Sequence, residues 1–334
     1  MSYLLKPLQN GKLTLKNRLI MPPMATAKCG DNGKLSRDIL DYYDEKSRGG
    51  YISLIIIEHS FITQQGKASY KQLSIADDAC VESLKELAGT IHRNGSKTVM
   101  QINHAGGKAS KEITGMDVVG PSSAAIPLRQ DNAAPKELTH KEIKAIIKEF
   151  KAAAHRVKEA GFDGVEIHSA HGYLLNQFFS PLTNKRTDEY GGDLLGRIKI
   201  HLEVIKAVRE AVDEDFPILL RLGACDYMEG GISIEDSKTA ALEFEKAGIE
   251  ILDISGGFRG YIRPGVTEQG YFADLTEAIK KVVSIPVLLT GGITEAQAAE
   301  KLLSEGKADL IGVGRAILND SSWAEKAIDS LTDI

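Results

Sequence analysis

Short apolar runs alternate with longer amphipathic stretches along the whole chain. Eight runs rich in Val, Ile and Leu recur, and most lack the strict polar alternation of a strand with one solvated face. Such runs are typical of strands buried on both faces of a parallel sheet. They span residues 17–24, 51–58, 97–103, 162–168, 216–222, 249–256, 285–292 and 308–315.

Stretches with helical periodicity separate these runs. The clearest covers residues 139–161, where four apolar side chains between Ile143 and Phe150 recur at helical spacing. Thr139 and Glu142 form a capping-box pattern at its start. We expect further helices over residues 36–48, 77–94, 193–213, 233–247, 274–283, 294–305 and 321–331.

Eight strand–helix pairs in strict alternation predict a (β/α)8 TIM barrel. An open doubly wound sheet is the alternative, but no G-x-G-x-x-G turn follows the first run. We expect residues 1–334 to form one domain, because α/β barrels often use this many residues. Residues 104–138 would form an extended third βα loop of the kind that covers active sites. Residues 4–15 would form a β-hairpin that closes the bottom of the barrel, with Asn10-Gly11 as its turn.

Charge and cysteine content exclude several classes of protein. The formal net charge is -5, and no dense Lys/Arg run could neutralise nucleic-acid phosphates. The densest apolar run, residues 54–57, is far too short to cross a bilayer, and the first ten residues have no long apolar signal core. Three scattered cysteines suit a reducing compartment and cannot form a four-cysteine metal site. We therefore expect a cytoplasmic protein that binds neither nucleic acid nor membrane.

Polar side chains gather where the predicted strands end. Gln101, His168 and Arg221 stand at the carboxyl ends of three apolar runs, which is where a barrel carries its chemistry. Burying such groups is costly without partners, so their repeated position suggests one shared polar ligand. The last two runs end in Gly291-Gly292 and Gly314-Arg315, at the strand ends where barrels commonly bind phosphate.

His168 and His171 can face one small volume at a strand-to-helix junction. A close histidine pair either binds a metal or donates hydrogen bonds to a substrate oxygen. The metal interpretation lacks an obvious third ligand, with Glu166 as the best candidate, and we expect no metal. Tyr173, two residues further on, is either a packing residue or a proton donor.

The stretch VEIHSAHGYLLNQFFSPLTNKRTDEYGGDLLGR, residues 165–197, is similar to the central signature of the Old Yellow Enzyme family. Further similarity occurs in the family's order in residues 16–26, 54–60, 100–109, 219–226, 288–293 and 308–318. The resemblance spans nearly the whole chain, and HSAHGYLLNQF with the RTDEYGG that follows is its most specific part. It implies non-covalent FMN and hydride transfer from NADPH or NADH to an electron-poor alkene: an enone, enal, nitroalkene, maleimide or quinone.

The resemblance also implies roles for individual residues. His168 and His171 match the pair that binds the substrate oxygen, and Tyr173 matches the proton donor. Gln101 and Arg221 match contacts to the flavin pyrimidine edge, where they would stabilise negative charge near N1. The remaining matches are flavin-ring contacts at Pro22, Pro23, Met24, Ala25 and His59, and a phosphate cradle at Gly291, Gly292, Gly314 and Arg315. We also expect Thr26 and Lys108 to contact the substrate.

Three features depart from the family pattern. Ala25 stands where members commonly carry Thr or Cys near the flavin O4 edge, so one contact that tunes the redox potential is missing. Ala27 replaces a tyrosine that one branch, the thermophilic-like reductases, places over the substrate. The last residues, SLTDI, lack the arginine that some members insert into a neighbour's site. We expect a homo-oligomer from the resemblance, but not one in which a neighbour completes the pocket.

Other barrel enzymes are alternatives. Dienoyl-CoA reductases and trimethylamine dehydrogenases append an iron–sulfur site and further domains. Here we expect electrons directly from NADH or NADPH, and a dienoyl reductase-like barrel without that site remains an alternative. Dihydrouridine synthases need a basic surface for tRNA and a reactive cysteine on a catalytic loop, and this acidic sequence shows neither. A cofactor-free lyase or isomerase usually has Lys or a carboxylate at the strand ends, whereas this sequence has His, Gln and Arg there. A binding protein would leave the His168, His171 and Tyr173 cluster unexplained.

Overall fold

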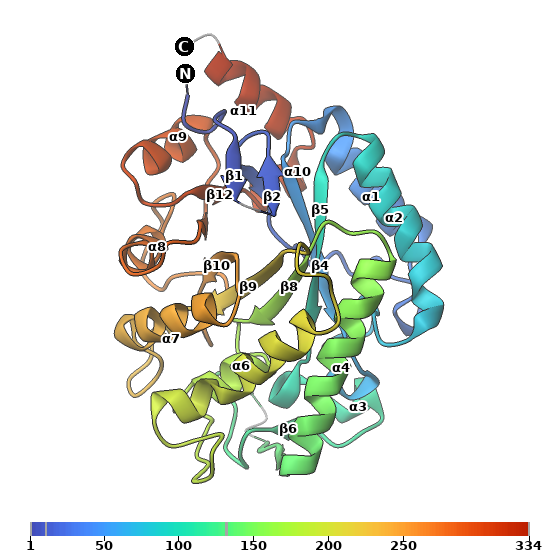
Figure 1. Ribbon diagram of the computed structural model, residues 1–334, viewed down its shortest axis with the longest axis vertical. Helices are drawn as coiled ribbons and strands as arrows, with labels where there is room; N and C mark the ends of the chain where they lie inside the picture. The colour runs from blue at the N-terminus through green and yellow to red at the C-terminus, as the bar shows by residue number, and fades with distance from the viewer. Residues whose placement is uncertain (1, 11, 131–132, 333–334) are drawn as a thin grey trace.

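Eight parallel strands close into a barrel in the computed structural model, which describes residues 2–10, 12–130 and 133–332 (Figure 1). Each strand pairs with its chain neighbour, and the last pairs with the first. The strands are β3 (Leu19–Met21), β4 (Leu54–Phe61), β5 (Lys97–Asn103), β8 (Val165–Ser169), β9 (Ile218–Gly223), β10 (Ile251–Ser255), β11 (Val287–Thr290) and β12 (Leu310–Gly312). Each lies in or overlaps one of the predicted runs, so the predicted (β/α)8 barrel is confirmed.

Helices follow the strands and surround them (Figure 1). The predicted helices are α1 (Arg37–Ser47), α2 (Val81–Arg93), α4 (His140–Glu159), α6 (Leu194–Arg209), α7 (Ile234–Lys246), α8 (Ala273–Lys280), α9 (Ala296–Ser304) and α11 (Trp323–Thr332). Helix α4 begins at the capping box of Thr139 and Glu142, as predicted. Three shorter helices were not predicted: α3 (Lys111–Thr114), α5 (Leu174–Phe179) and α10 (Arg315–Asn319).

The apolar core has two parts because strand side chains alternate between the two faces of the barrel wall. Outward-facing residues pack against the helices in a large cluster. Inward-facing residues at the amino ends of the strands form a second cluster with the hairpin of β1 (Leu8–Asn10) and β2 (Leu13–Leu15). The hairpin therefore closes the bottom of the barrel, as predicted, although Gly11 of its expected turn lies outside the described residues. A functional site is therefore expected at the opposite end, where the strands have their carboxyl ends.

The third βα loop is long, as predicted, and packs beside the fourth. It carries α3 and a small parallel pair, β6 (Val119–Gly120) with β7 (Lys136–Glu137). The Gln177 side chain of α5 joins the two loops: its Oε1 accepts from Gly107 N–H at 2.9 Å, and its Nε2 donates to the carbonyl oxygens of Ala105 and Gly172. This fixes the segment before α5, which contains His171 and Tyr173, against the third loop.

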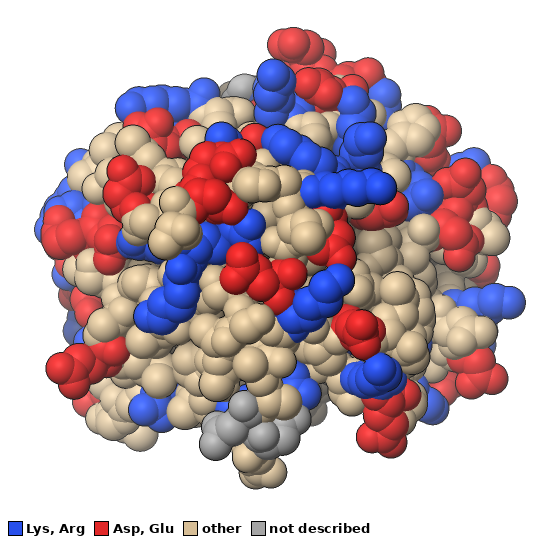
Figure 2. All heavy atoms as spheres, turned by 90° about the horizontal axis from the view of Figure 1, so that it is seen from below, with Lys and Arg blue, Asp and Glu red and all other residues tan. Residues whose placement is uncertain are grey.

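Lysine, arginine and acidic side chains are interspersed over the face shown in Figure 2, with no continuous basic surface there. Among the described residues, we find no helix that combines the length and the apolar character needed to cross a membrane.

Candidate functional site

A cavity of about 400 Å³ opens among residues at the carboxyl ends of the barrel strands. Predicted site residues supply much of its wall: Pro22, Pro23, Met24, Ala25, His59, Gln101, His168, His171, Tyr173, Arg221, Gly292, Gly314 and Arg315. They come from seven strands or the loops that follow them. The rule that barrels place polar side chains at this end therefore identified one common site.

Strand register explains why polar side chains from neighbouring strands meet. His168 on β8, Arg221 on β9 and Asp253 on β10 are consecutive register partners, and all three are buried. Gln101 on β5 pairs in the same way with Glu166 on β8. Side chains at paired positions point to the same face of the sheet, so these residues share the barrel interior.

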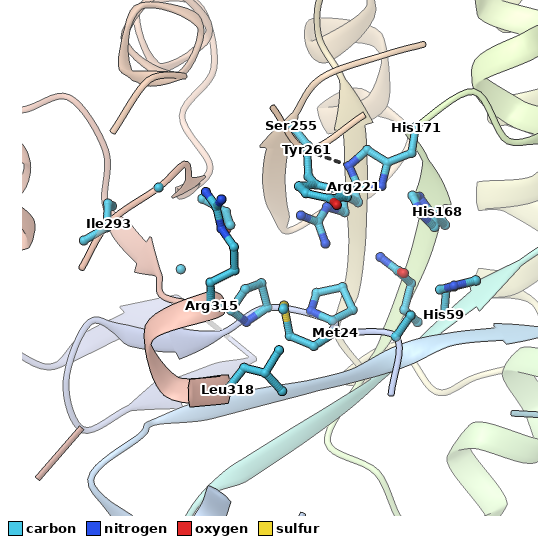
Figure 3. A pocket seen from close by; sticks show the side chains of 18 of the residues that line it. Met24, His59, His168, His171, Arg221, Ser255, Tyr261, Ile293, Arg315 and Leu318 are labelled. Atoms are coloured by element: carbon cyan, nitrogen blue, oxygen red, sulfur yellow. Dashed lines mark hydrogen bonds between the residues drawn. The ribbon is translucent and has the colours of Figure 1, made fainter. Parts of the chain in front are cut away.

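The rings of His168, His171 and Tyr173 converge on one side of the cavity, where Figure 3 shows the two histidines. The ring centroids of His168 and His171 are 5.2 Å apart, and those of His168 and Tyr173 are 5.0 Å apart. A left-handed turn after β8 makes this possible, because His171 and Gly172 both have positive φ, of 58° and 70°. A non-glycine residue at such φ is uncommon and is concentrated at functional turns.

Both histidines of this group are neutral donors or acceptors at ordinary pH. Burial, aided by nearby positive charge, holds the pKa of His168 and of His171 well below the usual range. The Ala170 N–H donates to His168 Nδ1 at 3.3 Å, which leaves the ring proton on Nε2. The Nε2 atom of His171 lies 2.7 Å from the Ser255 hydroxyl oxygen (Figure 3).

His59 brings a third imidazole to the cavity, 5.3 Å from the Tyr173 ring centroid to centroid. A register shift between Ile57 and Ser60 re-aims this part of β4, as bulges beside active sites commonly do. The Gln72 amide nitrogen donates to His59 Nδ1 at 2.7 Å, so the proton of the neutral ring sits on Nε2. Burial and the charge of Arg221 lower the pKa of His59 to about 4, which keeps the ring neutral.

Backbone atoms and one guanidinium line the other side of the cavity, where Figure 3 places Arg315 and Ile293. Strand β12 ends at Gly312, and Arg315 is the first residue of α10 rather than the last of the strand. Arg315 donates to the Tyr271 hydroxyl at 3.2 Å. A Cβ on Gly292 would come within 2.5 Å of the Tyr271 ring, and one on Gly314 within 2.8 Å of Met24. Only glycine at positions 292 and 314 therefore fits beside these side chains and leaves the backbone accessible from the cavity.

Three predicted site residues do not line this cavity. The Thr26 hydroxyl turns away and donates to Glu58 Oε2 at 2.6 Å. Lys108 lines a second cavity on the far side of Tyr173 and donates to the His171 carbonyl oxygen at 2.6 Å. Gly291 accepts from Gly270 N–H at 2.6 Å, so its place is in the loop packing.

Several wall residues were not predicted: Ser255, Tyr261, Tyr271, Thr290, Ile293, Thr294, Gly312 and Leu318. Ser255 ends β10, so the strand-end rule could have found it. Tyr261 and Tyr271 lie in the loop that follows β10, where no periodicity marks a residue as facing the site.

Glu166 does not join the histidine pair as a metal ligand. It is fully buried, and its Oε1 accepts from Gln101 Nε2 at 2.7 Å. In the part of the chain that the structure describes, one trio of His or carboxylate side chains has metal-like spacing, His140 with Asp188 and Glu189. That trio lies on the surface, away from the cavity, and belongs to an ion-pair group.

Comparison with known proteins identifies the family. Residues 3–333 match the family described as NADH:flavin oxidoreductase / NADH oxidase. The chain belongs to this family. An Old Yellow Enzyme homologue from Zymomonas mobilis has the same fold, with a TM-score of 0.84 and 26% identity over 98% of this chain and 93% of that one. The resemblance to Old Yellow Enzymes drawn from the sequence is therefore confirmed.

Two curated relatives show how lengths vary within the family. An NADH oxidase of Thermoanaerobacter brockii is 43% identical over 95% of this chain and 49% of its own length. An NADPH dehydrogenase of Listeria monocytogenes is 38% identical over 99% of this chain and 96% of its own length. The chain thus spans about half the length of the first relative and nearly all of the second.

The cavity fits FMN, the cofactor of this family. Its volume lies in the range of small-molecule sites. The Arg221 guanidinium and the Thr290 hydroxyl form no well-aligned hydrogen bond within the described residues, although Arg221 Nε lies 3.2 Å from Asp253 Oδ2, and both residues line the cavity. Unpartnered buried polar atoms are costly, so a polar ligand is expected beside them. Gly292, Gly314 and Arg315 would hold the phosphate, and Gln101 and Arg221 the pyrimidine edge.

Proposed function

We propose that this protein is an FMN-dependent oxidoreductase that passes hydride from NADPH or NADH to the C=C bond of an electron-poor alkene. Enones, enals, nitroalkenes, maleimides and quinones are the substrate class. When bound, FMN supplies the two-electron carrier between nicotinamide and alkene. The proposal takes residues 1–334 as one domain with one active site.

The convergence of His168, His171 and Tyr173 on one cavity wall carries this proposal. An enone gains negative charge on its carbonyl oxygen as hydride reaches its β-carbon. A neutral imidazole that keeps a proton on the nitrogen facing the cavity can donate to that oxygen. His168 meets this requirement through Nε2, because Ala170 occupies its Nδ1 atom. His171 meets it if Ser255 donates to Nε2, which leaves the ring proton on Nδ1.

Tyr173 is the proposed proton donor to the α-carbon of the alkene. Burial raises the pKa of its hydroxyl to about 12, so the group keeps its proton at neutral pH. Within the described residues that hydroxyl makes no hydrogen bond, and it is therefore available to substrate. Lys108 lies 5.7 Å from the ring centroid on the side of the second cavity, and it offers positive charge when the phenolate forms.

The remaining wall residues would hold the cofactor. Arg221 and Gln101 would donate to its pyrimidine edge, and Arg221 would offset negative charge there. Arg315 would contact the phosphate, beside the open backbone of Gly292 and Gly314. The Pro22–Ala25 segment would border the ring system, and Leu318 and Ile293 would exclude water from it.

A turnover screen tests the proposal. Purified protein should carry yellow FMN absorption that NADPH or NADH bleaches and cyclohexenone or maleimide restores. Titration with a phenol should give a long-wavelength charge-transfer band if His168 and His171 bind phenolate over the flavin. His171→Ala should abolish that band and slow alkene turnover by about 10²–10³-fold. The matched control, His155→Ala, removes an exposed imidazole from α4 and should change neither. An unchanged band in His171→Ala would refute the oxyanion role.

Molecular oxygen is a second candidate acceptor, because a relative that is 43% identical is named an NADH oxidase. If oxygen is the physiological acceptor, oxygen uptake per NADH should exceed alkene reduction at saturating alkene. If alkenes suppress oxygen uptake completely, the alkene proposal is favoured. The expected homo-oligomer stays a prediction that size-exclusion chromatography with light scattering would check.

A further inference from the structure

Two buried carboxylates lie next to the cavity, on the two strands that flank the strand of Arg221. Glu166 on β8 and Asp253 on β10 are both fully buried inside the barrel, on either side of Arg221 on β9. The Arg221 Nε atom lies 3.2 Å from Asp253 Oδ2 but is not aligned for a hydrogen bond. Arg221 also lines the cavity, so the residue that pairs with Asp253 borders the ligand space as well.

Most oxygens of this pair lack partners. Gln101 donates to Glu166 Oε1, but Glu166 Oε2 and both Asp253 oxygens accept no well-aligned hydrogen bond within the described residues, although the Thr290 hydroxyl lies near Asp253. The charged or polar groups acting on Glu166 are Asp253, Arg221 and Gln101. Those acting on Asp253 are Arg221, the Thr290 hydroxyl and Glu166.

Charge balance shows that the two carboxylates cannot both be ionised cheaply. Two negative groups and one positive group would leave an uncompensated buried charge, and a buried group of this kind takes up a proton instead. Burial and the neighbouring charge of Asp253 raise the pKa of Glu166, and burial raises that of Asp253. Together the pair holds one proton under conditions in which isolated carboxyls would hold none.

We propose that the Glu166–Asp253 pair is a proton store coupled to the redox state of FMN, and that above neutral pH, where the resting pair has lost its shared proton, Glu166 takes up a proton when the cofactor takes up hydride. Hydride brings two electrons and one hydrogen nucleus from the nicotinamide, and the second proton comes from solvent to the Glu166 carboxylate. Both leave on reoxidation: hydride goes to the electron acceptor, and the Glu166 proton returns to solvent. Glu166 acts through Arg221 and Gln101, so it is a positioning residue for charge and not a catalytic one.

The physical cause is competition for Arg221. Negative charge on the reduced cofactor would attract the Arg221 guanidinium, which otherwise stabilises the carboxylates. The same negative charge would also repel the two carboxylates directly. Both effects favour protonation of the pair, and the coupling is reciprocal. This inference rests on the proposed binding of FMN beside Arg221, but it does not depend on which alkene is reduced.

The test is the pH dependence of the FMN midpoint potential in the holoenzyme, measured by dithionite titration with a reference dye. One proton for two electrons gives about 30 mV per pH unit, and two protons give about 59 mV. We expect wild type to show a steeper segment above neutral pH that Glu166→Gln lacks. The Gln side chain can still accept from Gln101, and Glu214→Gln, an exposed change, serves as the matched control. Equal slopes in wild type and Glu166→Gln across the whole range would overturn the proposal.

A second variant keeps the test decisive if Glu166→Gln folds poorly. Asp253→Asn removes the like charge beside Glu166, so the steeper segment should move to lower pH. A segment that does not move would contradict the shared store. Reduced-minus-oxidised infrared spectra recorded above neutral pH give an independent readout: a protonated carboxyl C=O band should appear on reduction in wild type and be absent in Glu166→Gln. Because dithionite replaces the nicotinamide, a protein that binds FMN but reduces no alkene would refute the proposed function and leave this test intact.

Discussion

Replacing Gly292 with alanine should weaken FMN binding much more than the backbone cost alone would suggest. Gly292 has φ of 66°, in the left-handed region, and it lines the cavity beside Arg315. Alanine there would cost about 1–2 kcal/mol of folding free energy, because its Cβ crowds the following carbonyl oxygen. That part of the effect acts on the protein with or without cofactor.

The larger effect comes from the Tyr271 ring. The new methyl carbon would lie 2.5 Å from Tyr271 Cε1, whereas carbon atoms in contact normally stand about 3.5–4 Å apart, so the ring must move by roughly 1 Å. Its hydroxyl accepts from Arg315 and donates to the Tyr261 carbonyl, so Arg315 loses its support. A hydrogen bond to a charged group contributes about 1.5–3 kcal/mol, which is roughly a tenfold to hundredfold rise in the Kd for FMN.

Gly306→Ala is the matched control. Gly306 has φ of 72°, but its added Cβ would meet nothing within 4 Å, so it carries the backbone cost without the contact. Thermal unfolding of the apoproteins should show destabilisation of both variants, and a larger one for Gly292→Ala, because only its methyl group also displaces the Tyr271 ring. Fluorescence titration with FMN should show a raised Kd for Gly292→Ala alone. If the two variants bind FMN equally well, the assignment of Gly292 and Arg315 to the phosphate site is wrong.

Three further predictions concern single side chains. Tyr173→Phe should slow alkene reduction by about 10²-fold or more but leave reduction of FMN by NADPH unchanged in stopped-flow half-reactions; equal slowing of both steps would exclude the proton-donor role. Ala25→Thr or Ala25→Cys should raise the FMN midpoint potential, because the neighbouring Thr26 hydroxyl is committed to Glu58 and cannot act in its place; an unchanged potential would count against that contact. Burial raises the pKa of Glu58 to about 7 from 4.5, so the folded state holds an extra proton between these values. Denaturant unfolding at a series of pH values checks this. Relative to Glu58→Gln, wild type should lose about 3 kcal/mol of unfolding free energy between pH 4.5 and pH 7. If the unfolding free energies of the two proteins change in parallel with pH, Glu58 is not the titrating group.

The barrel was predictable because its two periodicities are strong and local. The run at 97–103 became β5 over the same residues, and the amphipathic stretch at 139–161 became α4 with its capping box. Much of the site followed from the same pattern. The carboxyl ends of all the strands of a barrel lie at the same end of the molecule. Polar residues at those ends, such as Gln101, His168 and Arg221, are therefore predicted to lie close together.

What escaped prediction depends on geometry that no short pattern encodes. Simple alternation along β4 would put Glu58 inside the barrel with Leu54 and Ile56, but the register shift turns His59 inward instead. Family resemblance, not periodicity, had pointed to His59. Asp253 is different: a carboxylate in the middle of the apolar run 249–256 is the same signal that marked Arg221, and it was available in the sequence.

The hydrogen-bond pattern of the cavity is therefore set by residues around the catalytic rings as much as by the rings themselves. Each of the three imidazoles receives its orientation from a different kind of partner: a backbone N–H for His168, an amide for His59 and a hydroxyl for His171. Backbone and amide donors leave one tautomer only, whereas a hydroxyl can donate or accept. His171 is consequently the ring whose proton can change sides when a substrate oxygen arrives. Ser255, at the end of β10, decides that side and should shape which oxygen acceptors the cavity binds.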